Sequence, residues 1–150
     1  MATRRRFLFT LSALAGAALA ARGAHAQTLT DRETLLRRIT GGSAVQQGRV
    51  TFDTPELADN GHAVPVRIAV DSPMTAADHV RSITVIAERN PRPIVATFHL
   101  GPHSGRAQVV TRIRLADTQE VLALAQLSDG SYWLGGARVV VTELACVESG

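Results

Sequence analysis

The stretch VPVRIAV, residues 64–70, decides the fold class of this chain. Every second residue in it is a large aliphatic one, and the residues between them are Pro65, Arg67 and Ala69. Successive side chains of a β-strand point to opposite faces, so a period of two indicates one face in the core and one in solvent. Residues 64–70 therefore predict a half-buried strand.

The same alternation recurs along the chain. Apolar residues alternate again in 83–87, 97–100 and 109–115, and strand-like runs follow at 122–127 and 139–144. Turn sequences separate these runs, at 59–61, 71–73, 90–91, 101–102, 104–105, 128–130 and 135–136. About seven short strands at this spacing predict an all-β fold, an immunoglobulin-like antiparallel β-sandwich.

A short helix is predicted before the first strand. Residues 30–33, TDRE, have the spacing of a capping box, in which a threonine hydroxyl and a glutamate carboxylate satisfy amides at the helix end. An apolar stripe then follows, and the glycine pair 41–42 ends it; the stripe consists of Leu35, Leu36 and Ile39. We expect a helix over 31–39, acting either as a lid on the core or as a docking helix for a partner.

The first 26 residues have the three-part layout of a cleaved export signal. Arginines at 4–6 form a basic start, an apolar run continues to Ala21, and the segment ends in Ala24-His25-Ala26. Residues 3–8, TRRRFL, match the twin-arginine signature for bacterial export, and an ordinary secretory signal is the alternative. We therefore expect residues 1–26 to be removed, leaving one periplasmic domain, 27–150.

Loss of this leader changes the charge of the chain. The full sequence has 16 Lys and Arg against 13 Asp and Glu, and four of the arginines lie in the leader. The mature chain then carries a formal charge of −1, which argues against nucleic acid or a membrane surface as a partner. No run after residue 26 approaches the roughly 18 apolar residues of a membrane span.

Cys146 is the only cysteine, and it lies beyond the last predicted strand. An odd cysteine in an exported chain indicates an intermolecular bridge or a reactive thiol. A thiolate can hold sulfur as a mixed disulfide or persulfide. Residues 143–150 reach about 25 Å when extended, so we predict an arm that carries Cys146 into a partner's active site. The alternative, a core thiol, would more naturally lie within a strand.

Histidines, serines and one tryptophan offer other kinds of site. His99 and His103 lie close in sequence, and imidazole suits copper or zinc, but the Gly-Pro between them does not place them on one face. We predict no metal site, with a metal-binding sandwich as a third hypothesis that would also draw on His62 and His79. The serines fall in turns with no nucleophile-elbow pattern, so no catalytic residue and no enzymatic activity are predicted; they are Ser43, Ser72, Ser104, Ser128 and Ser131. Trp133 is predicted to be a core aromatic, with ligand stacking as the alternative.

Several segments together resemble the SoxY family, the sulfur-carrier subunits of the periplasmic SoxYZ complex in thiosulfate oxidation. The resemblance covers nearly the whole mature domain. It rests on the order and spacing of ADNGHAVPV (58–66), VDSPMT (70–75), AERNPRP (87–93), ATFHL (96–100), TRIRLA (111–116), TQ (118–119) and SDGSYW (128–133).

This resemblance implies a function. It implies an immunoglobulin-like sandwich, a heterodimer with a SoxZ-like subunit, and sulfur intermediates bound covalently to Cys146. The partner enzymes it implies are a haem cytochrome pair that loads thiosulfate, a hydrolase that removes sulfate, and a sulfane dehydrogenase. It implies no resident cofactor beyond the bound sulfur.

The arm departs from the family pattern, which ends Gly-Gly-Cys-Gly-Gly. Here Cys146 is flanked by other residues, namely Leu144, Ala145, Val147 and Glu148. Side chains in place of glycine make the arm stiffer and thicker, and Glu148 adds a negative charge near an anionic cargo. We therefore keep two hypotheses, a sulfur carrier and a structural or recruitment module that retains partner binding without carrier activity.

Overall fold

The computed structural model describes residues 31–143. The chain divides into two compact units after Gly42. The predicted leader and Thr30 of the capping box lie outside the described residues. None of the helices in the described range is both long and apolar enough to span a bilayer.

In the first unit, residues 31–40 are helical, as predicted for 31–39. The Arg37 side chain donates to the Glu33 carboxylate one turn earlier. The helix ends at two glycines with positive φ, 64° at Gly41 and 88° at Gly42. The Gly42 amide donates to the Arg37 carbonyl at 3.1 Å, which is the closing bond of a Schellman motif.

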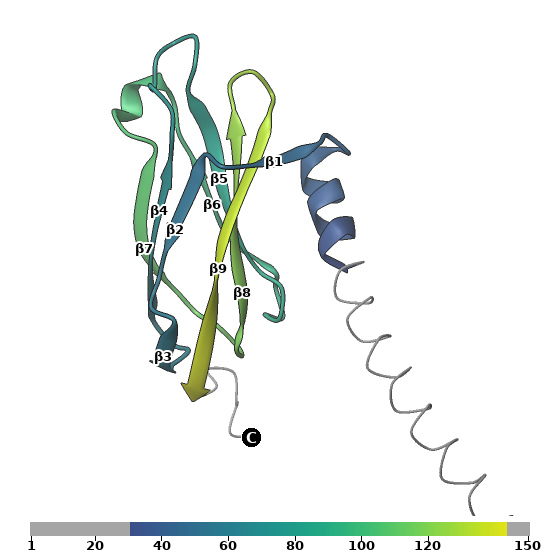
Figure 1. The fold of residues 1–150 in the computed structure, drawn as a ribbon, viewed down its shortest axis with the longest axis vertical. Coiled ribbons are helices and arrows are strands. Elements are labelled where there is room, and N and C mark those ends of the chain that lie inside the picture. Colours follow the sequence, from purple (N-terminus) through teal and green to yellow (C-terminus); the bar gives the residue numbers. More distant parts are fainter. Residues whose placement is uncertain (1–30, 144–150) are drawn as a thin grey trace, which may run out of the picture. The chain divides into compact units, whose positions relative to one another are not determined.

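The second unit is a sandwich of two sheets, drawn as two layers in Figure 1. The centre of the large sheet is antiparallel and consists of β5 (Val80–Ala87), β8 (Gln119–Leu127) and β9 (Tyr132–Glu143). One margin of this sheet is β6 (Ile94–His99), which pairs antiparallel with β5. The sandwich predicted from the sequence is confirmed.

The small sheet has three antiparallel strands in the order β2-β4-β7. Its central strand, β4 (Val64–Val70), is the alternating stretch that predicted the fold. β2 (Val50–Asp53) and β7 (Gln108–Ile113) flank it. A 3-10 turn over Pro102–Ser104 lies between β6 and β7 in sequence.

The other margin of the large sheet is made by residues 45–60, which pass from this sheet to the small sheet and back. It starts as β1 (Val45–Gln47), which pairs in parallel with β9. It then crosses to the small sheet as β2 and returns as β3 (Leu57–Asn60), which again pairs in parallel with β9. These three short strands raise the total within residues 31–143 to nine, above the seven or so that the sequence predicted.

The core lies between the sheets. Its largest fully buried side chains come from β4, β5, β8, β9 and the segment after β7, among them Ile68, Ile83, Leu115, Leu127 and Val139. The predicted inward residues of β4 and β7 are buried, and Arg67 and Arg112 face out.

The prediction of one solvent face for every strand is wrong for β5 and β8. On β5, Thr84 and Ile86 are buried as well as Ile83 and Val85. Most residues on both faces of these two strands are buried, so neither face is reserved for polar groups. Period two is therefore clearest on β4 and β7, in the small sheet.

Trp133 on β9 is half-buried and packs against the core, as predicted. Its indole Nε1 donates to the Ser131 hydroxyl at 3.0 Å. The Arg49 guanidinium lies 5.0 Å from the ring centroid, within range of a cation–π contact. These contacts occupy the ring edge and face within the protein.

Candidate functional site

Cys146 and the predicted arm residues Leu144, Ala145, Val147 and Glu148 lie outside the described residues. What the structure describes is the place from which they start. Strand β9 ends at Glu143, three residues before the cysteine. We call the end of β9, residues 139–142, together with the backbone and side chains that hold it, the arm base.

On one side, the arm base is held by β3. Val140 pairs with Leu57 and Val141 pairs with Ala58 in a parallel register. The Val140 amide donates to the Glu56 carbonyl at 2.8 Å. The Thr142 hydroxyl donates to the Asp59 carbonyl at 2.5 Å. Backbone and side-chain hydrogen bonds therefore tie the end of β9 to β3.

On the other side, the arm base is held by β8 and by one threonine hydroxyl. The Thr118 hydroxyl accepts from the Val141 amide at 2.9 Å and donates to the Val141 carbonyl at 3.4 Å. Gln119, the first residue of β8, pairs with Val139. Thr118 directly precedes β8, so its hydroxyl extends the hydrogen bonding between β8 and β9 by one residue past the start of β8.

A network of polar side chains holds the segment 117–119 in place. The Gln119 side chain is only 4% exposed, and it accepts from the Arg89 amide at 2.9 Å and donates to the Asn90 side chain at 3.1 Å. Asn90 also accepts from the Ala116 amide and donates to the Arg114 carbonyl, at 2.9 and 2.8 Å. An exposed Arg89–Asp117 ion pair at 3.0 Å closes the network.

The consequence for the arm is geometric. Because β9 is held from both sides, the point where the arm leaves the sandwich is fixed. Three residues of extended chain span at most about 11 Å, so Cys146 is confined to that distance from Glu143.

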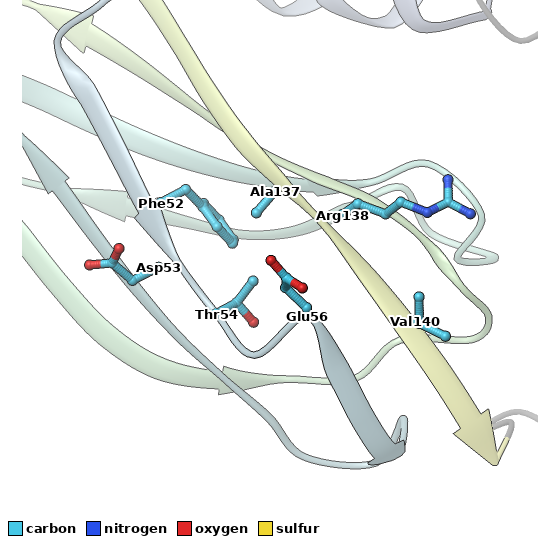
Figure 2. Close-up of a pocket in the computed structure, with 7 residues that line it drawn as sticks. All are labelled: Phe52, Asp53, Thr54, Glu56, Ala137, Arg138 and Val140. Atoms are coloured by element: carbon cyan, nitrogen blue, oxygen red, sulfur yellow. The ribbon is translucent and has the colours of Figure 1, made fainter.

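A surface groove of about 530 Å³ lies beside β9, next to the arm base. It is lined by residues of β2, of the loop after it, and of β9: Phe52, Asp53, Thr54, Glu56, Ala137, Arg138 and Val140. Figure 2 shows the Arg138 guanidinium extending away from the Glu56 carboxylate. The lining contains no histidine and no serine, and its Thr54 hydroxyl donates to the Pro65 carbonyl at 3.0 Å.

The histidines do not gather. His62 lies 3.5 Å from the Arg114 guanidinium, and His79 Nδ1 lies 3.1 Å from the Thr75 carbonyl. His99 is exposed on β6, and His103 is exposed in the 3-10 turn. Among residues 31–143, no three His, Cys, Asp or Glu side chains lie close enough to hold a metal ion.

The serine hydroxyls serve turns. Ser72 accepts from the Met74 amide at 3.2 Å, and Ser104 accepts from the Gly101 amide at 3.1 Å. Ser128 accepts from the His79 backbone amide and donates to the Ala77 carbonyl. Ser131 donates to the Asp129 carboxylate, and this bond with that of the Ser131 amide lowers the pKa of Asp129. These bonds are structural and involve no imidazole ring.

Comparison with known families decides the assignment. The family model described as sulfur oxidation protein SoxY matches residues 36–146, so the match runs through the sandwich and the arm base to the cysteine. The chain belongs to the SoxY family. The resemblance seen in the sequence is confirmed, and the matched segment includes Thr118, Gln119 and Asn90, whose role at the arm base sequence reasoning missed.

Solved structures share the fold. The sulfur carrier protein SoxY from Chlorobium limicola f thiosulfatophilum is 24% identical and superposes with a TM-score of 0.65, covering 78% of this chain and 96% of that one. A superoxide reductase (neelaredoxin) from Ignicoccus hospitalis is 18% identical with a TM-score of 0.55, covering 63% and 80%. At these identities the likeness shows a shared sandwich. No curated protein matches the sequence significantly.

Proposed function

We propose that this protein is a periplasmic sulfur carrier that holds sulfur-oxidation intermediates covalently on Cys146 and presents them to partner enzymes. The observation that carries the proposal is the family match extending to residue 146, the position of the single cysteine. The arm base supports it, because β9 is tied on both sides immediately before the tether begins. The chain itself then performs no catalysis, and the enzymes that act on the cargo are separate proteins.

The proposed chemistry belongs to the thiolate of Cys146. Loading with thiosulfate forms a sulfur–sulfur bond between Sγ and the outer sulfur of thiosulfate, and two electrons must leave. The haem cytochrome pair implied by the family resemblance would accept them. The sulfate-releasing hydrolase then removes the sulfonate group, and the sulfane dehydrogenase acts on the sulfur that remains on Cys146. No resident cofactor is needed on the carrier.

The proposed setting follows from the leader and from the family. An export signal over residues 1–26 delivers the chain to the periplasm, where thiosulfate oxidation by this system takes place. A SoxZ-like subunit is the proposed partner of the sandwich. Neither nucleic acid nor a membrane surface is proposed as a partner.

Intact-protein mass spectrometry tests the carrier role. The protein is purified without reductant from cells supplied with thiosulfate, and again from cells grown without it. We expect sulfur adducts in the first sample that map to Cys146, are removed by a reductant, and are absent from a Cys146→Ser variant. The variant should fold normally, since a residue beyond the last strand contributes little packing.

The opposite result favours the recruitment module. In that case the Cys146 thiol stays unmodified in cells that oxidise thiosulfate, while the protein still copurifies with its SoxZ-like partner. The feature that favours this second candidate is the arm sequence, in which no glycine flanks the cysteine.

A further inference from the structure

An arginine and a histidine lie side by side at the end of the sandwich from which the arm leaves. Arg114 Nη2 is 3.5 Å from His62 Nδ1, and both side chains are exposed. His62 lies in the turn between β3 and β4, and Arg114 directly follows β7. The fold therefore brings together two residues that are 52 positions apart in the sequence.

Hydrogen bonds fix the backbone on which this pair stands. The Leu115 amide donates to the Gly61 carbonyl at 2.8 Å, which joins the segment after β7 to the turn that contains His62. The Arg114 carbonyl accepts from the Asn90 side chain at 2.8 Å. The two side chains are thus exposed, but they start from a backbone that is held in place.

No acidic side chain neutralises the pair. A second exposed arginine, Arg112, lies two residues before Arg114, and the residue between them is buried, so both arginines face solvent. Among residues 31–142, no carboxylate forms an ion pair with Arg112, Arg114 or His62. Asp117, the acid nearest to Arg114 in sequence, pairs instead with Arg89 at 3.0 Å. A guanidinium presents its N–H donors in a planar fork, which suits the oxygens of an anion.

The tether of Cys146 reaches this pair. Asn60 pairs with Glu143 in a parallel register, as Figure 1 shows for β3 and the end of β9, and paired strands lie about 4.8 Å apart. His62 follows Asn60 by two residues, so its Cα lies within about 12 Å of the Glu143 Cα. Cys146 extends to about 11 Å from the same point, and cargo on its sulfur extends further.

We propose that Arg114 and His62 bind the sulfonate group of the sulfur cargo on Cys146. Such binding presupposes the carrier role proposed for this cysteine. After loading with thiosulfate, the cargo ends in a sulfonate, which has a negative charge and three acceptor oxygens. The guanidinium N–H groups that do not face His62, and the imidazole N–H at Nε2, donate to these oxygens. Removal of the sulfonate leaves a persulfide without these oxygens, so the pair distinguishes the two forms of cargo.

Nuclear magnetic resonance of the purified mature chain tests this binding. Tetrathionate loads Cys146 without a partner enzyme, because the thiolate attacks an inner sulfur, forms a sulfur–sulfur bond to it and releases thiosulfate. The intact mass confirms loading before the spectra are recorded. We expect the signals of the Arg114 Nε–H group and the His62 ring to shift on loading. The signals of Arg106 and His103, which lie before the opposite end of β7, should not shift.

Matched variants test the guanidinium. Arg114→Gln should reduce the shift at His62 about threefold or more, since it removes the charged donor. Arg106→Gln, which removes an exposed arginine at the other end of the sandwich, should leave the shift unchanged. The Arg114→Gln variant should fold normally, because the lost side chain is exposed and the backbone carbonyl still accepts from Asn90.

Chemical controls identify the anion. Iodoacetamide gives Cys146 a neutral cap, which should leave the Arg114 and His62 signals in place. Glu148→Gln removes the acid two residues from Cys146 and should not reduce the shift on loading. Tetrathionate added to Cys146→Ser, which cannot be loaded, should cause no shift.

Several results overturn the inference. These are Arg114 and His62 signals that do not move on loading, that move equally with the neutral cap, that move in Cys146→Ser, or that no longer move in Glu148→Gln. A chain that shows any of them and still carries sulfur adducts in cells is a carrier without this site. A Cys146 thiol that tetrathionate does not modify overturns the carrier role as well.

Discussion

The two margins of the large sheet are built in different ways. Along β9, two parallel strands, a threonine hydroxyl and a buried glutamine network engage the chain up to Glu143. Along β6, the backbone faces outward with no partner strand among the described residues, and no charged side chain protects it. One margin is closed by the protein's own chain, and the other is open.

The closed margin fixes where the cysteine-bearing tail begins, because hydrogen bonds from β3 and from Thr118 hold the end of β9. The open margin has no partner strand among the described residues. Stability should therefore depend strongly on residues near the closed margin and weakly on exposed residues of the open one.

Leu115 should give the largest contrast. It is fully buried at the end of the sandwich from which β9 leaves, and its amide donates to the Gly61 carbonyl at 2.8 Å. Leu115→Ala should lower the free energy of unfolding by about 2–5 kcal/mol, since it leaves a cavity. Ile94→Ala on β6 should change it by about 0.5 kcal/mol or less. Chemical denaturation measures both; equal effects would contradict the contrast.

The second largest effect on stability is expected at Gly135, which lies where residues 45–60 cross from the large sheet to the small sheet. A Cβ there would lie 2.5 Å from the Val50 carbonyl oxygen and 2.9 Å from its Cβ. Gly135→Ala should cost about 1–3 kcal/mol of stability, because the backbone of β2 must move. The control is Gly101→Ala, where a Cβ meets nothing within 4 Å and φ is negative. A neutral Gly135→Ala would mean that the two strands are not in close contact.

Thr118 tests the hydrogen bonds of the arm base. Thr118→Val removes the hydroxyl that bonds the Val141 amide and carbonyl, at a cost of about 1–3 kcal/mol. Thr118→Ser keeps the hydroxyl and should recover most of the loss. Hydrogen exchange at the Val141 amide should speed up in Thr118→Val and stay slow in Thr118→Ser. A serine variant as unstable as the valine variant would show that packing, and not the hydroxyl, holds β9.

The smallest effect is expected at the opposite end of β9, in the turn that precedes it. Hydrogen bonds from Ser131 lower the pKa of Asp129 below 3.8. A carboxyl with a lowered pKa in the folded state contributes stability above its unfolded pKa, and the contribution is lost as pH falls through the folded value. Asp129→Asn should therefore destabilise slightly at neutral pH, and the difference from wild type should vanish in acid below the folded pKa. A difference independent of pH in denaturation curves would contradict this.

Much of this architecture could be predicted from residues alone. Apolar and polar residues alternate along β4 and β7 because each strand has one buried face, and the glycines at 41–42 mark the helix end. The strands β1, β2 and β3 could not be predicted, because three or four residues are too few to establish a period. Their pairing with β9 and β4 arises only in the folded chain.

The candidate site divides in the same way. Cys146 stands out in the sequence as the only cysteine, after the last strand, so a reactive thiol could be predicted there, and its role stays a prediction. The arm base could not, since Thr118 and Val141 are 23 residues apart and Asn90 and Gln119 are 29 apart. Such polar residues look like ordinary turn residues until the fold brings them together.

The most direct test of the carrier role is the mass of the intact chain taken from cells that are oxidising thiosulfate. We predict a reducible sulfur adduct on Cys146 that disappears when thiosulfate is withdrawn and never forms in Cys146→Ser. A Cys146 thiol that remains free throughout active thiosulfate oxidation would contradict it.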